Sequence, residues 1–414
     1  MNPTLGLGLF LAGLLAVKGL QQAKAPPRNQ KTPNHSQDWR NKEMAWVLAQ
    51  HNLNFGFKLF QKLAAHNPGK NIFFSPLSIS TAFSMLCLGA QNATLAEIKK
   101  GFDFQDMSDR DLHLAFHYLL RRLNKKTQDL QLELGNTLFI DEKLKPRTRF
   151  LRQAKSVYNA DTVLTNFKSL DDTQRQINSY ISQKTQGRIR NLIRNIDPGT
   201  VMILANYIFF RARWKYEFDP KETKQEDFFV EGKKPVKVPM MFHGGMYDMA
   251  YDKKLACTIL EMPYKDNITA TFILPDDGKL QLLEQGLQVH IFAKWKSLLS
   301  KRVVDVHLPR LHISGAHNLK KVLSGLGISK VFEEHGDLSR ISSHRSLKVG
   351  EAIHKAELKL DEKGTEGSAG TGAQTLPMEN PEIIKMNKSF LFMLYENSMP
   401  SMIFLARVYD PSGK

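Results

Sequence analysis

The side chains of this chain that could act as nucleophiles, bases or metal ligands do not form a catalytic pattern. Ser368 lies in a glycine-rich stretch, but a serine nucleophile needs a fixed base beside it, and a mobile loop cannot hold one. The sequence has no G-x-S-x-G, H-E-x-x-H, P-loop or Rossmann motif. Four loosely spaced histidines are more typical of surface or core positions than of metal ligands: His312, His317, His335 and His344. We therefore expect a protein that is not an enzyme and needs no cofactor.

The stretch 351–381 changes character halfway along. Residues 353–360 alternate between apolar and polar side chains, which predicts a half-buried strand with His354, Ala356, Leu358 and Leu360 on its inner face. From Gly364 the alternation continues with side chains too small to anchor the segment, so it should be an exposed loop. Composition alone favours a surface loop with a single state. However, one face could enter a sheet without burying a charge: Thr365, Gly367, Ala369, Thr371, Ala373 and Thr375.

The loop opens with Glu362, Gly364, Thr365 and Glu366, and the strand before it has His354, Lys355 and Ala356. These residues resemble the hinge pattern of the serpin family, clade A. The run 387–411 resembles the closing signature of that family, and the match stays in register from residue 45 to the C-terminus. We take the hinge to be Glu362, Gly364, Thr365, Gly367 and Ala369.

The resemblance implies that a protease attacks this chain. Counting from the hinge as serpins do places the scissile bond between Met378 and Glu379. A chymotrypsin-like serine protease would form an acyl-enzyme at Met378, whose long apolar side chain does not suit a trypsin-like pocket. The freed loop would then slide between the strands expected at 353–360 and 201–214, and the protease would be trapped in a covalent complex.

The match around residues 371–380 extends to one adipose-derived member of the family. That likeness implies a chymotryptic tissue kallikrein as the target and an adipokine role that no residue here demonstrates. Some residues depart from the inhibitory pattern. Gly367 and Gly370 make ordering the loop more costly than alanine would, by about 0.5–1 kcal/mol each, and Glu379 places a carboxylate after the scissile bond. The alternative is a non-inhibitory serpin that acts as a carrier or signalling ligand.

Two further groups follow from the resemblance and the strand pattern. The first is a polar cluster at the point where the sheet must open, and buried polar groups of this kind must bond to one another; it comprises Ser75, Ser78, Asn206, His354 and Trp214. Satisfied core residues without a gating role are an equal alternative. The second is a basic set on the outward strand faces and nearby: Arg188, Arg190, Arg211, Arg213, Lys215 and Lys359.

Charge and length set the broad class. The 414 residues carry a formal net charge of +17, which calls for an anionic partner. In a secreted protein that partner is heparin or heparan sulfate rather than nucleic acid, although a solvated basic face is the equally weighted alternative. We expect a monomer that does not insert into membranes.

The sequence predicts a secreted protein with a single domain. Residues 5–17 form an apolar run too short to span a bilayer, which predicts a signal peptide at 1–20. A flexible tail at 21–44 and one serpin domain at 45–414 should follow, with a reactive-centre loop at 362–381. Helix patterns dominate early and strand patterns late, so the expected fold class is α+β with a large, mostly antiparallel central sheet.

Covalent features are few. Acceptor triplets for N-glycosylation begin at Asn34, Asn92 and Asn267, and a fourth at Asn387 should open a strand too close to the core. The two cysteines, Cys87 and Cys257, should be free core thiols, with a single bridge as the other possibility.

Overall fold

The structure is a computed structural model that describes residues 35–124, 127–344, 347–364 and 380–412. Its longer helices lie mainly in the first half of the chain, as expected. The α-helices of the described residues are α2 (His35–His66), α3 (Pro76–Cys87), α4 (Asn92–Gly101), α5 (Asp109–Leu123), α6 (Thr148–Tyr158), α7 (Leu170–Lys184), α8 (Leu280–Gly286), α9 (Val289–Leu298) and α10 (Leu319–Ser324). Short 3-10 turns stand at Glu142–Leu144, Pro220–Glu222 and Lys330–Phe332.

A five-stranded sheet positions the candidate site. Its strand order is β10-β11-β4-β2-β3. The strands are β2 (Leu130–Asp141), β3 (Asp161–Thr165), β4 (Met202–Ala212), β10 (Leu311–Asn318) and β11 (Glu351–Leu360). β10 with β11 and β2 with β4 pair antiparallel, whereas β11 with β4 and β2 with β3 pair parallel. The sheet is therefore more mixed than the expected mostly antiparallel one.

The remaining strands form a second sheet in the order β1-β14-β13-β8-β7-β6-β9-β12, with β5 beside β6. They are β1 (Ile72–Phe74), β5 (Lys224–Phe228), β6 (Val236–Asp252), β7 (Cys257–Pro263), β8 (Ile268–Pro275), β9 (Ser300–Pro309), β12 (Glu382–Lys385), β13 (Phe390–Glu396) and β14 (Ser401–Val408). β1, near the start of the described chain, pairs with β14 at its end, so the two ends of the domain close on each other.

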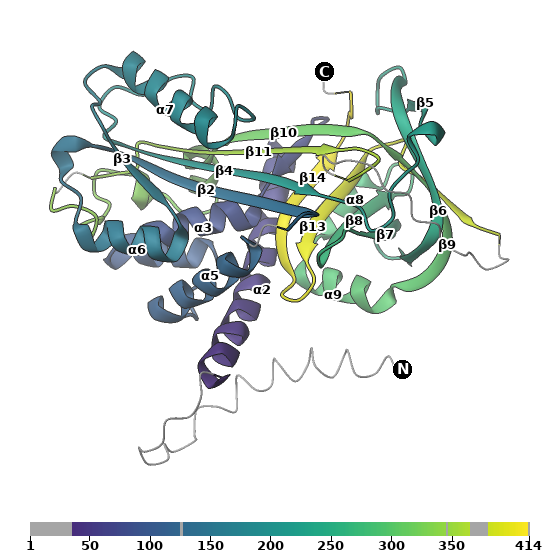
Figure 1. Ribbon diagram of the computed structural model, residues 1–414, viewed down its shortest axis with the longest axis horizontal. Helices are drawn as coiled ribbons and strands as arrows, with labels where there is room; N and C mark the ends of the chain where they lie inside the picture. The colour runs from purple at the N-terminus through teal and green to yellow at the C-terminus, as the bar shows by residue number, and fades with distance from the viewer. Residues whose placement is uncertain (1–34, 125–126, 345–346, 365–379, 413–414) are drawn as a thin grey trace, which may run out of the picture.

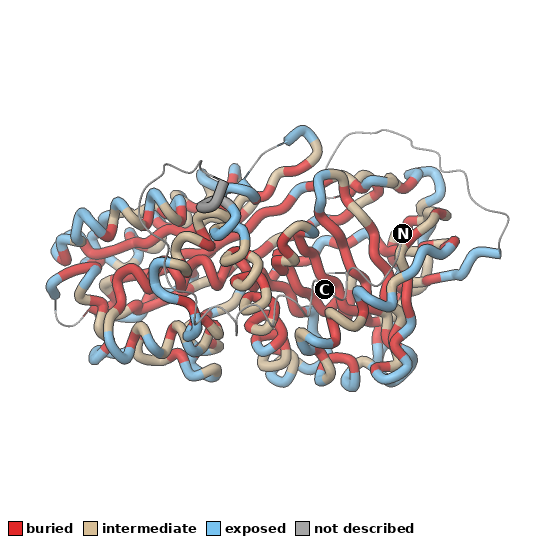
Figure 2. Tube along the Cα trace, turned by 90° about the horizontal axis from the view of Figure 1, so that it is seen from below, coloured by how far each residue is buried: buried red, intermediate tan, exposed pale blue. Residues whose placement is uncertain are grey.

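Helices cover both faces of the five-stranded sheet. Figure 1 shows α7 on one face and α3, α5 and α6 on the other. The large core extends from Ala45 to Tyr409, and a smaller one under α7 joins Ile177 and Ile181 to Tyr207 of β4. Buried segments follow the strands, whereas exposed ones follow the loops and outer helix faces (Figure 2). An added strand would thus have to enter a sheet that is covered on both sides.

The helix that leads into the expected domain begins before residue 45, within the expected tail. α2 starts at His35, so residues 35–44 of the expected tail are helical. In this first part Trp39 is exposed, and Arg40 pairs with Asp111 of α5 at 3.5 Å. A helix extends from a packed nucleus at little cost, which explains a start without apolar periodicity.

The strands expected at 201–214 and 353–360 are confirmed, with small differences at their ends. Both cysteines are buried and free, as expected. In the described part of the chain, no helix is long and apolar enough to cross a membrane.

Candidate functional site

The ladder between β4 and β11 stops before either strand ends. The two strands pair in parallel from Ile203 with Glu351 as far as Phe209 with Glu357. Beyond this point β4 continues to Ala212 beside β2 alone, and β11 continues to Leu360 beside β10 alone. We call this unpaired stretch the open end of the ladder. It lies beside the hinge, which follows β11 directly.

Gly364 sits in the open end. It forms an antiparallel bridge to Arg213 after β4 and another to Asp361 after β11. Its φ of +130° and a Cβ position 2.1 Å from the Ala212 carbonyl oxygen leave no room for a side chain. The backbone at Gly364 therefore already runs antiparallel to both strands, which is the direction an inserted strand would take.

Glu362 anchors the chain before Gly364. Only 5% of its surface is exposed. Its Oε1 accepts hydrogen bonds from Arg310 Nε at 2.7 Å and from Thr223 Oγ1 at 2.5 Å. Burial pushes the pKa of Glu362 upward, but these hydrogen bonds outweigh burial and hold the pKa below its ordinary value. The carboxylate is therefore charged at neutral pH and fixes one end of the hinge.

Trp214 lies apart from the polar cluster to which the sequence assigned it. Its indole stacks on Tyr264 with ring centroids 3.9 Å apart, and its Nε1 donates to the Asp361 carbonyl at 3.1 Å. Its backbone N–H donates to the Lys363 carbonyl at 3.0 Å. Trp214 therefore supports the hinge, whereas the cluster forms around Asn206, about 26 Å further back at 3.3 Å per strand residue.

The other four members of the cluster meet in one buried hydrogen-bond chain. His354 Nε2 accepts from the Ser75 backbone N–H at 3.0 Å, and its Nδ1 donates to Asn206 Oδ1 at 2.6 Å. Asn206 Nδ2 donates to Ser78 Oγ at 2.8 Å, and the Ser78 N–H donates to Ser75 Oγ at 3.1 Å. Since Asn206 and His354 are paired across β4 and β11, these bonds join the two strands.

The structure adds two residues that the sequence analysis did not assign to this cluster. Asn136 lies opposite Asn206 on β2 and accepts from its Nδ2 at 2.7 Å, while its own buried Nδ2 has no partner among the described residues. The ring of His317 on β10 stacks on that of His354 with centroids 6.4 Å apart, and its Nε2 is 2.9 Å from the Phe73 carbonyl oxygen. Only the strand order brings these two residues to the cluster.

Acid should weaken this cluster. Burial holds the pKa of His354 well below its ordinary 6.5. Protonation of Nε2 would also turn it into a donor that faces the Ser75 N–H, so the hydrogen bond between them would be lost. Below pH 6.5 His354 binds a proton in the unfolded chain but not in the folded chain, so the free energy of unfolding falls as the pH falls. Between pH 7 and pH 5 this one group should cost about 2 kcal/mol of unfolding free energy.

The measurement is denaturant unfolding at pH 7 and pH 5. His354→Gln should lose about 2 kcal/mol less over this range than the wild type. His312→Gln is the control because His312 is 65% exposed, and it should behave as the wild type does. Equal acid sensitivity of His354→Gln and the wild type would show that His354 can be charged inside the fold.

The basic residues lie partly together on the outer face of the sheet. Arg211 is exposed on β4, and exposed Lys359 is level with it on β11, two residues beyond the last pair. The Arg188 guanidinium lies over the Phe209 ring, 4.1 Å from its centroid. Arg213 is 3.5 Å from Asp129 and thus partly neutralised, and exposed Lys215 lies past the end of β4. Arg190 is exposed, and its backbone carbonyl accepts from Lys355.

This geometry agrees with what the comparisons show. The model of the Serpin (serine protease inhibitor) family matches residues 50–411. The chain belongs to the serpin family. It is 67% identical to Serpin A12 of Rattus norvegicus over 411 residues, covering 99% of this chain and all of the relative, and 62% identical to Serpin A12 of Homo sapiens over the full length of both. The expected clade A membership is confirmed; the adipose-derived relative that the sequence suggested, vaspin, is Serpin A12.

Solved serpin structures confirm the fold. Human thyroxine-binding globulin, solved with thyroxine bound, gives a TM-score of 0.84 at 34% identity and covers 89% of this chain and 99% of its own. Human glycosylated kallistatin gives 0.83 at 36% identity, with the same coverage. As a serpin, the protein belongs to a family of inhibitors and is not an enzyme. Within the described ranges, no three His, Cys, Asp or Glu side chains gather as a metal would need.

Several predicted serpin residues lie outside the described ranges: the scissile pair Met378 and Glu379, the hinge residues Thr365, Gly367 and Ala369, and Asn34. Of the glycosylation candidates, Asn92 and Asn267 are exposed, and their side-chain amides bind Asp337 and Glu396. Asn387 is half-buried, and it precedes β13 by three residues instead of opening a strand. Their modification stays a prediction.

Proposed function

We propose that this serpin is a secreted, monomeric suicide inhibitor of a chymotrypsin-like serine protease. The observation that carries the proposal is the double antiparallel bridge of Gly364 at the open end of the β4–β11 ladder. A strand that continued from it would be antiparallel to β4 and to β11. It would replace one parallel pairing by two antiparallel ones, which are slightly more stable per residue.

The chemistry begins with the protease. Its serine oxygen attacks the carbonyl carbon of Met378, the bond to the Glu379 nitrogen breaks, and the new amine leaves with the C-terminal segment. Met378 remains esterified to the serine. The loop then loses its C-terminal tether while Glu362, held by Arg310, keeps the other end fixed.

Insertion would then compete with hydrolysis of the ester. About fifteen residues span roughly 50 Å when extended, so the acylated protease would be carried that distance. About ten new backbone hydrogen bonds at about 1 kcal/mol each could distort a triad that tolerates displacements of only about 1 Å. Insertion that is faster than hydrolysis traps the protease, whereas slower insertion makes the loop a substrate.

The target class follows from the residues at the scissile bond. Met378 fits an apolar primary pocket, and Glu379 requires a protease that tolerates or pairs a carboxylate just after the bond. A chymotryptic tissue kallikrein as the target and an adipokine role, both implied by the resemblance around residues 371–380, remain part of this proposal.

The experiment is denaturing electrophoresis after mixing the purified chain with a chymotrypsin-like protease. We expect a covalent band at the summed masses of protease and serpin, less the released C-terminal peptide. Cleavage after Met378 without that band would overturn the inhibitor proposal and favour a carrier or signalling serpin.

Heparin or heparan sulfate is the second partner that we propose. Arg211 on β4 and Lys359 on β11 lie level with each other on adjacent strands. Arg188 lies over Phe209, which is two residues before Arg211 on β4, so sulfates along one polysaccharide chain could reach all three side chains. Arg211→Ala should lower the salt concentration that elutes the protein from a heparin column. Arg175→Ala should leave it unchanged, because Arg175 is exposed on α7, pairs with Asp172 and is not one of these three residues. Equal elution of both variants would remove this face from consideration.

A further inference from the structure

A cavity lies on the side of the five-stranded sheet away from the basic face (Figure 1). It is a cavity of about 610 Å³ between the end of α3 and the first turns of α5 and α6. Figure 1 shows α3, α5 and α6 on the face of the sheet opposite α7. The cavity is therefore separate from the outer basic face and from the hinge.

The rim of this cavity is cationic. Arg110, Arg147, Arg149 and Arg340 line it, against a single carboxylate, that of Asp109. Lys99 Nζ already pairs with Asp109 Oδ1 at 2.9 Å. Arg147 Nε donates to the Ser339 carbonyl at 2.9 Å. Within the described part of the chain none of the four arginines lies within 4.0 Å of a carboxylate, although Arg340 is near enough to Asp337 to lower the pKa of that carboxyl.

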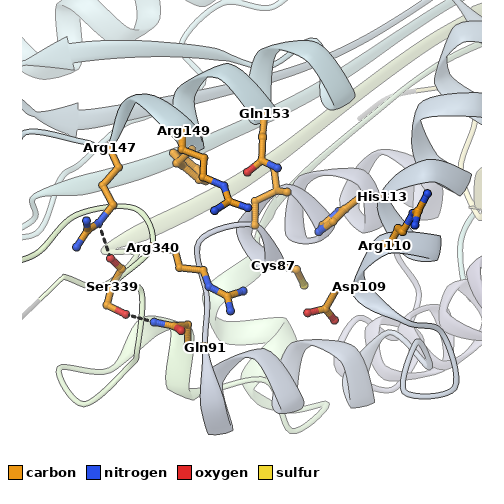
Figure 3. Close-up of a pocket in the computed structure, with 12 residues that line it drawn as sticks. Cys87, Gln91, Asp109, Arg110, His113, Arg147, Arg149, Gln153, Ser339 and Arg340 are labelled. Atoms are coloured by element: carbon orange, nitrogen blue, oxygen red, sulfur yellow. Dashed lines mark hydrogen bonds between the residues drawn. The ribbon is translucent and has the colours of Figure 1, made fainter.

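Two of the arginines converge. Figure 3 shows the guanidinium groups of Arg149, on α6, and Arg340, from the loop after the last 3-10 turn, directed toward the middle of the cavity near Cys87. Arg147 turns toward Ser339, and Arg110 stands at the far edge. Arg149 and Arg340 are both exposed, so their heads are available to a ligand.

The first turn of α6 adds partial positive charge. This helix has 11 residues, its N-cap is Arg147, and no side chain caps its first N–H groups. The orphan N–H groups of a helix start favour an anion. Arg149 in this turn and Arg340 opposite it provide the full charges.

The floor of the cavity is apolar. Leu88, Phe150 and Cys87 line the cavity and are 8%, 2% and 2% exposed. Burial raises the pKa of the Cys87 thiol to about 12 and lowers that of His113 to about 4, so both are neutral at physiological pH. The His113 Nδ1 is also engaged with the Tyr158 hydroxyl at 2.6 Å.

We propose that this cavity binds a small organic molecule that carries a phosphate or sulfate group. The anionic group would lie between Arg149 and Arg340, since a guanidinium binds such oxygens in pairs, and the apolar part would rest on Leu88 and Phe150. The volume falls within the range of small-molecule sites, about 300–1,000 Å³.

The test uses 1-naphthyl phosphate as the probe and isothermal titration calorimetry of the full chain. We expect one site, with an affinity at least tenfold above that of inorganic phosphate, which lacks the ring, and of 1-naphthol, which lacks the charge. Inorganic phosphate that binds as tightly as the probe would overturn the proposal because the apolar floor would then contribute nothing. Failure of the probe to bind at millimolar concentration would also overturn it.

Variants locate the site. Arg149→Gln and Arg340→Gln should each weaken the probe about tenfold, or about 1.4 kcal/mol. Arg152→Gln is the matched control, because Arg152 is exposed on the same helix but does not line the cavity, and its affinity should be unchanged. The melting temperatures of all three variants verify that they fold. An equal loss in all three variants, or no loss in any, would contradict the assignment.

Discussion

Thr365→Arg should abolish the covalent band with a chymotrypsin-like protease while leaving cleavage after Met378 intact. Extending the two bridges of Gly364 by one residue places position 365 opposite Ala212 and Leu360. Both side chains are 1% exposed. An inserted arginine there would bury a guanidinium without a partner, at a cost of several kcal/mol at the first step of insertion. Hydrolysis of the acyl-enzyme would then win.

The matched control is Ser368→Arg. The same extension places position 368 opposite Phe209 and Glu357, on the outward face, where the arginine would stay at the surface beside a partly exposed carboxylate that His312 Nε2 contacts at 2.9 Å. This variant should keep most of the covalent band, and electrophoresis measures both variants in one experiment. A full band from Thr365→Arg would mean that the inward and outward faces of the loop are assigned the wrong way round.

Cleavage after Met378 should raise the melting temperature by about 20 °C. Insertion of residues 365–375 would add about ten backbone hydrogen bonds at about 1 kcal/mol each. In large domains 1 kcal/mol corresponds to about 2 °C. Differential scanning calorimetry of the intact and nicked proteins measures this shift.

The nicked Thr365→Arg variant provides the comparison, because it has the same broken bond but cannot insert. Its melting temperature should stay near that of its intact form. A nicked wild type that melts within a few degrees of the intact protein would show that the intact fold stores no excess free energy, and the trapping mechanism would lose its energy source.

Strand patterns in the sequence predicted much of the candidate functional site. Alternation along 353–360 predicted both β11 and the burial of His354, and the same rule placed Asn206 inward on β4. The two strands had been expected side by side from the family resemblance, and they are. Period-two patterning is clear along β11, where buried and partly exposed residues alternate, whereas β4 is buried on both faces over most of its length.

What the sequence could not provide depends on strand order and packing. Asn136 is a single asparagine in β2, and nothing marks it until the register places it opposite Asn206. The four arginines around the cavity come from α5, from α6 and its N-cap, and from a loop near residue 340, so no local pattern unites them. The sequence itself argues against placing Trp214 in the cluster, because Trp214 comes eight residues after Asn206 along the strand and no side chain can span that length.

The double bridge of Gly364 also fixes the alignment of any strand that continues from it. Counting seven residues onward brings Thr371 level with both Asn206 and His354, which are paired with each other before cleavage. The arriving hydroxyl can accept the proton of His354 Nδ1 and donate its own to Asn206 Oδ1. The hydrogen-bond chain that joins β4 and β11 therefore has room for one more member, and Thr371 is a residue of the right kind at that distance.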